Sequence, residues 1–184
     1  MSGNLSGIKV AILTTDGFEQ AELFEPKKAL EKAGATVHVI APKAGTVQGF
    51  KNLDKGDTIK ADKSFDDARA EDYDGVVLPG GVANGDALRM VDKARAFVKT
   101  VNDKHRPIAV ICHGTWLLVS TGIVKGRTVT SWPSLQDDIR NAGGKWVDQE
   151  VAHDGNLISS RKPDDLPAFN RTLIEALASV HAHH

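Results

Sequence analysis

The single cysteine of the chain, Cys112, stands where a thiol can act as a nucleophile. The apolar, β-branched run 108–111 before it is typical of a buried strand, and the run 116–119 after it is typical of a helix. A cysteine in a tight turn between strand and helix projects its thiol above the sheet edge, in a nucleophile elbow. The N-terminus of the helix favours thiolate, the nucleophilic form. We therefore expect a reactive sulfur, although a lone cysteine in an apolar strand is usually a small buried hydrophobic residue.

Two acidic residues near the N-terminus, Glu19 and Glu22, are three positions apart and share a helix face. Carboxylates at a helix N-terminus are favourable in themselves, which suffices to explain one of them. A carboxyl beside the cysteine sulfur and shielded from water would have a raised pKa. Protonated, Glu22 would donate a hydrogen bond to the sulfur, and deprotonated it would serve as a base.

The two glycines of a Pro-Gly-Gly turn, Gly80 and Gly81, follow the buried apolar run 75–78. A simple turn after a strand explains them equally well. Because they lack side chains, their backbone N–H groups can approach a developing oxyanion, and the amide of His113 adds another donor. These glycines are therefore candidates for an oxyanion loop.

His113 directly follows Cys112 and is the nearest candidate for a base. Adjacent side chains at a sharp turn often point apart, so we expect its backbone N–H to matter more than its ring. Asp86 comes a few residues after the glycines, and it either orients a histidine or caps the helix that follows.

Strand-like and helix-like segments alternate along the chain, which predicts βαβ units and a mostly parallel sheet. Ligands bind such sheets at the carboxyl ends of the strands. Three segments fall at those ends, namely 14–22, 79–86 and 112–114, and we expect them to form one site. The strand-like segments are 8–13, 36–40, 46–50, 58–61, 75–78, 108–111, 145–147, 150–153 and 157–160, and the helix-like ones are 19–33, 91–101, 116–121, 135–141 and 164–180.

Composition limits the classes of partner. The 184 residues fit a single domain, 1–184, with a core from about 8 to 180. The net charge of −1 comes without a basic stripe, so neither nucleic acid nor a membrane surface is an expected partner. One cysteine forms no internal disulfide. We find no metal-ligand spacing and no nucleotide-binding glycine motif, and therefore expect no cofactor.

The ends of the chain carry no targeting signal that we recognise. Residues 1–7 are polar and small and lack the pattern of a secretory signal. No apolar run approaches the about 18 residues that a spanning helix needs. We expect a soluble, cytoplasmic protein and assign no function to the histidine-containing tail, 181–184.

Four stretches of the chain together match a known family pattern, namely DGFEQAEL (16–23), VLPGG (77–81), AVICHG (109–114) and SSRKPDDLPAF (159–169), with smaller matches at GIVKGR (122–127) and NAG (141–143). On these motifs the chain resembles the PfpI family of intracellular cysteine proteases and general stress proteins. That family lies in the superfamily of the Parkinson's-disease protein deglycase, which is related to class I glutamine amidotransferases. The resemblance implies a flavodoxin-like, three-layer α/β/α sandwich and a homodimer, sometimes assembled into hexamers.

The resemblance also implies roles for single residues. Cys112 matches the family nucleophile, His113 the histidine beside it, and Glu22 the carboxylate that hydrogen-bonds the sulfur. Gly80 and Gly81 match the oxyanion loop.

Two positions depart from the family pattern. Asp86 is the best match to an acidic residue that reaches the histidine of the adjacent subunit, but the segment before it is one residue longer. Thr115 and Trp116 stand where close relatives usually carry Gly-Pro, and Trp116 can narrow or cap the substrate site.

Peptidase, glyoxalase and protein-deglycase activities are all assigned within this family, and each begins with a thiolate adding to a carbonyl. We favour a stress-protective enzyme that acts on reactive carbonyls, because aldehydes demand less of the site than peptides do. One alternative is a peptidase or amidase that uses Cys112 and His113 with an acidic residue. Another is a redox sensor or chaperone that acts through oxidation of Cys112.

Overall fold

A computed structural model of the chain describes residues 4–182, with side chains to residue 180, and the outermost parts of both end segments lie outside it. The central sheet joins seven strands, and each neighbouring pair is parallel except the outermost, β11–β12. The mostly parallel sheet is thereby confirmed. In spatial order the strands are β11 (Ala152–Asp154), β12 (Leu157–Ser160), β8 (Ile108–Ile111), β7 (Gly75–Leu78), β1 (Lys9–Leu13), β3 (Thr36–Ala41) and β6 (Lys63–Ser64).

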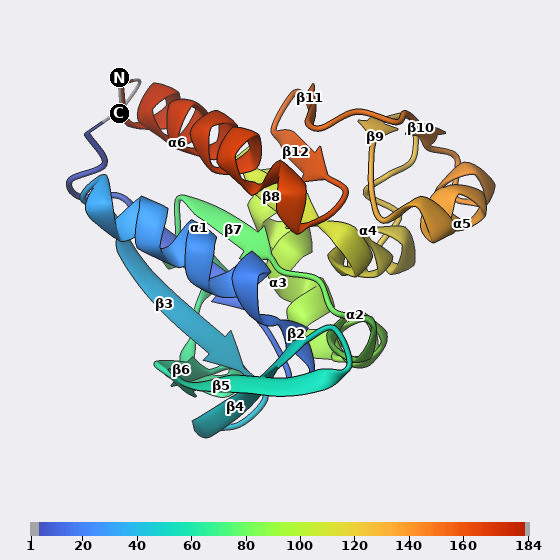
Figure 1. The fold of residues 1–184 in the computed structure, drawn as a ribbon. Coiled ribbons are helices and arrows are strands. Elements are labelled where there is room, and N and C mark those ends of the chain that lie inside the picture. The colour runs from blue at the N-terminus through green and yellow to red at the C-terminus, as the bar shows by residue number, and fades with distance from the viewer. Residues whose placement is uncertain (1–3, 183–184) are drawn as a thin grey trace.

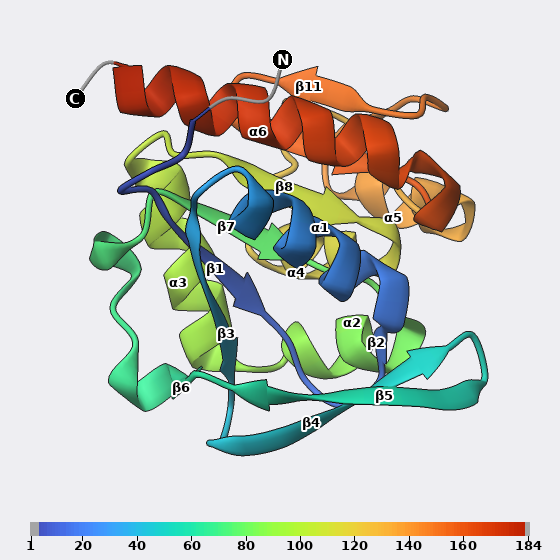
Figure 2. The same cartoon turned by 60° about the vertical axis from the view of Figure 1, so that its left-hand side comes forward.

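Helices cover both faces of this sheet (Figures 1 and 2). One face carries α1 (Gln20–Lys32) and α6 (Leu166–Ala182), which lie side by side. The other carries α2 (Val82–Leu88), α3 (Asp92–Asp103), α4 (Trp116–Ser120) and α5 (Gln136–Asn141). This is the three-layer, flavodoxin-like sandwich that the resemblance implied. Within residues 4–182, every helix is too short or too polar to span a lipid bilayer.

The central strands consist of unbroken apolar runs because helices cover both faces of the sheet. In β1, Val10 and Ile12 pack into the cluster beneath α1 and α6, whereas Ala11 and Leu13 pack into the cluster beneath α3 and α4. All four side chains are fully buried.

Two small sheets lie outside the central one. The hairpin of β4 (Gly45–Lys51) and β5 (Asp54–Ala61) confirms the two strands expected at 46–50 and 58–61, and β4 also pairs with β2 (Phe18–Glu19). The strand expected at 145–147 is β10 (Lys145–Trp146), and it pairs with β9 (Thr128–Val129).

The two-residue strands β2, β6 and β9 and helix α2 were not expected from the sequence. Helix α2 reads VANGDAL, and its asparagine and glycine have low helix propensity, so the pattern lacks a helical signal. Asp86 lies inside this helix rather than at its start, so the expectation that Asp86 caps a helix is wrong.

One buried side chain of α2 joins the loops that leave β1 and β7. Asn84 accepts hydrogen bonds through Oδ1 from the backbone N–H and the hydroxyl of Thr15, at 2.8 and 2.9 Å. Its Nδ2 donates to the carbonyls of Pro79 and Gly80, at 3.0 and 3.1 Å. Because Asn84 is fully buried, water does not compete for these bonds. The carboxyl ends of two neighbouring strands are thereby held at a fixed separation.

We predict that Asn84→Ala lowers the free energy of unfolding by about 3 kcal/mol, because it leaves several buried donors and acceptors without partners. Urea denaturation followed by circular dichroism measures this loss. The control is Asn141→Ala at the exposed end of α5, which should change stability by less than about 0.5 kcal/mol. Equal stabilities of the two variants would contradict the role given to Asn84.

Candidate active site

Cys112 lies directly after β8, where the chain turns sharply into α4 through a 3₁₀ turn, Cys112–Thr115. Its φ of 61° lies in the left-handed region, which is strained for a residue other than glycine. The elbow expected from the sequence is therefore present. The cysteine is 6% exposed and lines a cavity of about 550 Å³ at the carboxyl ends of β1, β7 and β8.

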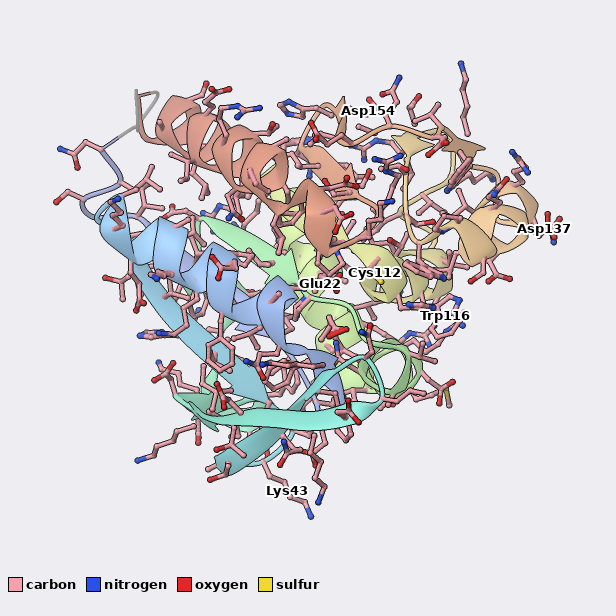
Figure 3. The ribbon with its side chains drawn as sticks, viewed as in Figure 1. Glu22, Lys43, Cys112, Trp116, Asp137 and Asp154 are labelled. Atoms are coloured by element: carbon pink, nitrogen blue, oxygen red, sulfur yellow. The ribbon has the colours of Figure 1, made fainter. Side chains whose placement is uncertain are left out.

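Glu22, on the first turn of α1, is completely buried and lines the same cavity (Figure 3). Its Oε1 accepts the backbone N–H of Gly80 at 2.9 Å, while Oε2 has no hydrogen-bond partner among the described residues. Burial raises the pKa of Glu22 to about 8, and the charge of Glu19 adds to the rise. The N–H of Gly80 and the contact with Cys112 oppose the rise without cancelling it. Glu22 is therefore mostly protonated near neutral pH.

The thiol of Cys112 is coupled to this carboxyl. Burial, followed by the charge of ionised Glu22, raises the pKa of Cys112, while the backbone N–H groups of His113 and Gly81 lower it. The helix N-terminus was expected to favour the thiolate, and the N–H of His113 does lower this pKa, but burial and the neighbouring charge outweigh it. When Glu22 is protonated it carries no charge, and it then no longer raises the pKa of Cys112.

The ring of His113 lies against the sulfur, with 3.2 Å between Nδ1 and Sγ of Cys112. The expectation that these side chains point apart is wrong, because the left-handed φ of Cys112 redirects its side chain. Trp116 and Trp132 hold the ring, with centroid distances of 5.2 and 5.7 Å. Burial lowers the pKa of His113, so the imidazole is neutral at neutral pH and can accept a proton.

Gly80 and Gly81 bring backbone close to the sulfur. A Cβ on Gly80 would lie 2.7 Å from Cβ of Cys112, and Gly81 has a φ of 97°. Only glycine avoids the clash at the first position, and glycine suits the backbone at the second. The N–H of Gly80 is engaged by Glu22, which leaves the N–H groups of Gly81 and His113 as the donors near the sulfur.

Two further residues expected at the site do line the cavity. Asp86 is exposed on α2, and within residues 4–182 no hydrogen bond links it to His113. Trp116 opens α4, and its Nε1 donates to Oδ2 of Asp138 at 3.0 Å. No three potential metal-ligating side chains of His, Cys, Asp or Glu gather anywhere in the described part of the chain.

No motif in the sequence predicted the part of the cavity wall that comes from distant segments of the chain. Phe50, Asn52 and Leu53 reach the cavity from the β4–β5 hairpin, and Trp132 reaches it from the loop after β9. Asn84 was also missed, although it fixes the glycine loop. None of these residues belongs to a motif, so their roles follow only from the way the chain folds.

Comparison with known proteins identifies the relatives of the chain. Deglycase TK1284 of Thermococcus kodakarensis is 40% identical over 92% of this chain and 99% of its own length. The "Putative cysteine protease YraA" of Bacillus subtilis is 39% identical over 92% of this chain and 98% of its own length. The structure of Drosophila melanogaster DJ-1beta has a TM-score of 0.84 at 28% identity, and the match covers 95% of this chain and 94% of that one. The model of the DJ-1/PfpI family matches residues 8–176, and the chain therefore belongs to the DJ-1/PfpI family.

Proposed function

We propose that this protein is a cysteine-dependent enzyme that converts reactive carbonyl compounds, with glyoxalase- or deglycase-like chemistry. The observation that carries the proposal is the contact of Cys112 with two proton-exchanging groups. One is the neutral imidazole of His113, and the other is the carboxyl of Glu22, with its pKa of about 8. The name deglycase, given to relatives such as the one from Thermococcus kodakarensis, supports this choice.

The first step is addition of the thiol across the aldehyde of methylglyoxal. A bond forms between Sγ of Cys112 and the aldehyde carbon while the thiol proton passes to Nδ1 of His113. The aldehyde oxygen then receives that proton, so the hemithioacetal contains every atom of the two reactants. The N–H groups of Gly81 and His113 are available to stabilise the oxyanion before it is protonated.

The second step moves a proton between adjacent carbons. Glu22 in its carboxylate form takes the proton from the former aldehyde carbon and returns it to the neighbouring carbon. The hydroxyl proton of the hemithioacetal passes at the same time to the neighbouring carbonyl oxygen, which yields a thioester. Water hydrolyses the thioester and restores the thiol. Methylglyoxal plus one water thereby gives lactic acid, with no external oxidant or reductant.

Peptide cleavage is the second candidate, because one relative carries a cysteine protease name. It requires a general acid for the leaving amine and an oriented histidine. Asp86 makes no hydrogen bond with His113 within the described chain, and Glu22 is completely buried. We therefore favour carbonyl chemistry. We further propose a cytoplasmic location and a homodimer.

We predict that the purified protein converts methylglyoxal to lactate. Cys112→Ser should lower kcat/KM by at least about 1000-fold, because it removes the nucleophile, and Glu22→Gln by about 100-fold, because it removes the proton carrier. Lactate quantified by chromatography gives the rates. Glu25→Gln, on the exposed side of the same helix, is the matched control and should match wild type. Peptide hydrolysis without lactate formation would instead show that the protein acts as a peptidase.

The raised pKa of Glu22 makes stability depend on pH. Its folded pKa of about 8 lies above the ordinary value of 4.5, so its stabilising contribution is complete below 4.5 and is lost as the pH rises through 8. We predict that Glu22→Gln gains about 4 kcal/mol of unfolding free energy relative to wild type between pH about 5 and pH about 8. Urea denaturation across this range tests the prediction. A constant difference between the two proteins would mean that Glu22 is ionised throughout.

A further inference from the structure

We propose that the preferred substrates are uncharged α-oxoaldehydes with an aromatic or bulky apolar substituent, such as phenylglyoxal, rather than small or anionic carbonyls. This inference rests on the proposed function and specifies the substrate class of the same site. The cavity of about 550 Å³ is far larger than methylglyoxal requires. Its walls indicate what else it accommodates.

The wall beside the sulfur is aromatic. Trp132 stacks on the ring of His113 with an interplanar angle of 26°, and Trp116 meets the same ring edge-on at 63°. Phe50, from the β4–β5 hairpin, lines the cavity as well. A planar aromatic substituent gains both apolar burial and ring contacts on such a wall.

Contacts within the chain hold Trp116 and the backbone of Trp132. The hydrogen bond from Nε1 of Trp116 to Asp138 and the guanidinium of Arg89, 5.5 Å from the ring centroid, hold Trp116. The backbone N–H of Trp132 donates to the carbonyl of Cys112 at 3.4 Å, and this residue, which is 38% exposed, stacks its indole on His113. Side chains that already have such contacts lose less entropy when a substrate binds.

The charged side chains of the cavity are acidic. Glu19 and Asp86 line it beside the mostly protonated Glu22, and in the described part of the chain no lysine or arginine does. An anionic carbonyl would meet repulsion from Glu19 and Asp86 without a compensating cation. Exposed apolar side chains, Leu53 at 95% and Val82 at 58%, extend the apolar lining to the rim.

The test compares kcat/KM for phenylglyoxal, methylglyoxal and 4-carboxyphenylglyoxal, each followed as the hydroxy acid formed, with the rate of Cys112→Ser subtracted. We expect kcat/KM for phenylglyoxal to be at least about tenfold higher than for methylglyoxal. It should also be at least about tenfold higher than for 4-carboxyphenylglyoxal. If methylglyoxal is converted as well as or better than phenylglyoxal, this inference fails while the proposed function stands. If none of the three is converted, both fail.

Two variants test separately the contributions of the aromatic wall and of the cavity's charge to substrate preference. Trp132→Leu should lower the ratio of phenylglyoxal to methylglyoxal kcat/KM by at least about fivefold. Val82→Lys should raise the ratio of carboxylated to plain phenylglyoxal by at least about fivefold, because it places a cation at the rim. Met90→Lys, at an exposed position outside the cavity lining, is the matched control and should leave that ratio unchanged. Unchanged ratios in Trp132→Leu and Val82→Lys would overturn the inference.

Discussion

The site depends on one buried hydrogen bond, from the backbone N–H of Gly80 to Oε1 of Glu22. It holds a carboxyl completely out of water and beside a cysteine. Burying a carboxyl is tolerable only when the group is protonated or hydrogen-bonded. Glu22 is mostly protonated near neutral pH, and one of its two oxygens accepts a hydrogen bond. This bond requires that the Pro79–Gly81 loop approach Glu22 without an intervening side chain. Hydrogen bonds of Asn84 hold that loop beside the end of β1.

The coupling of Glu22 and Cys112 follows from this burial. When two acidic groups are in contact, the charge on one repels a charge on the other. Ionising either group therefore raises the free energy needed to ionise its neighbour. The pair therefore behaves as a unit, with the neutral imidazole of His113 as a nearby acceptor. Such an arrangement suits a nucleophile that is released only when an electrophile arrives, and a carboxyl that changes protonation state during the reaction.

The scaffold and the walls of the site have separate origins. The parallel sheet brings the ends of β1, β7 and β8 together, which gathers the carboxyl, the glycine loop and the thiol at one edge. The aromatic and acidic lining comes from the β4–β5 hairpin, α2 and the loop after β9. The first set follows from the order of the strands in the central sheet, whereas the second set comes from segments outside that sheet.

The sequence by itself determined the mostly parallel sheet, the elbow and the gathering of three segments at one edge, whereas the three-layer sandwich was implied by the family resemblance. Apolar runs and turn glycines are local signals, and the geometry of parallel sheets places the ends of adjacent strands together. Only the tertiary structure decided the contact between Cys112 and His113, the raised pKa of the thiol, the place of Asp86 within α2, and the walls formed by Phe50 and Trp132. These depend on burial and on contacts between residues far apart in the chain. Neither leaves a periodic or compositional trace in the sequence.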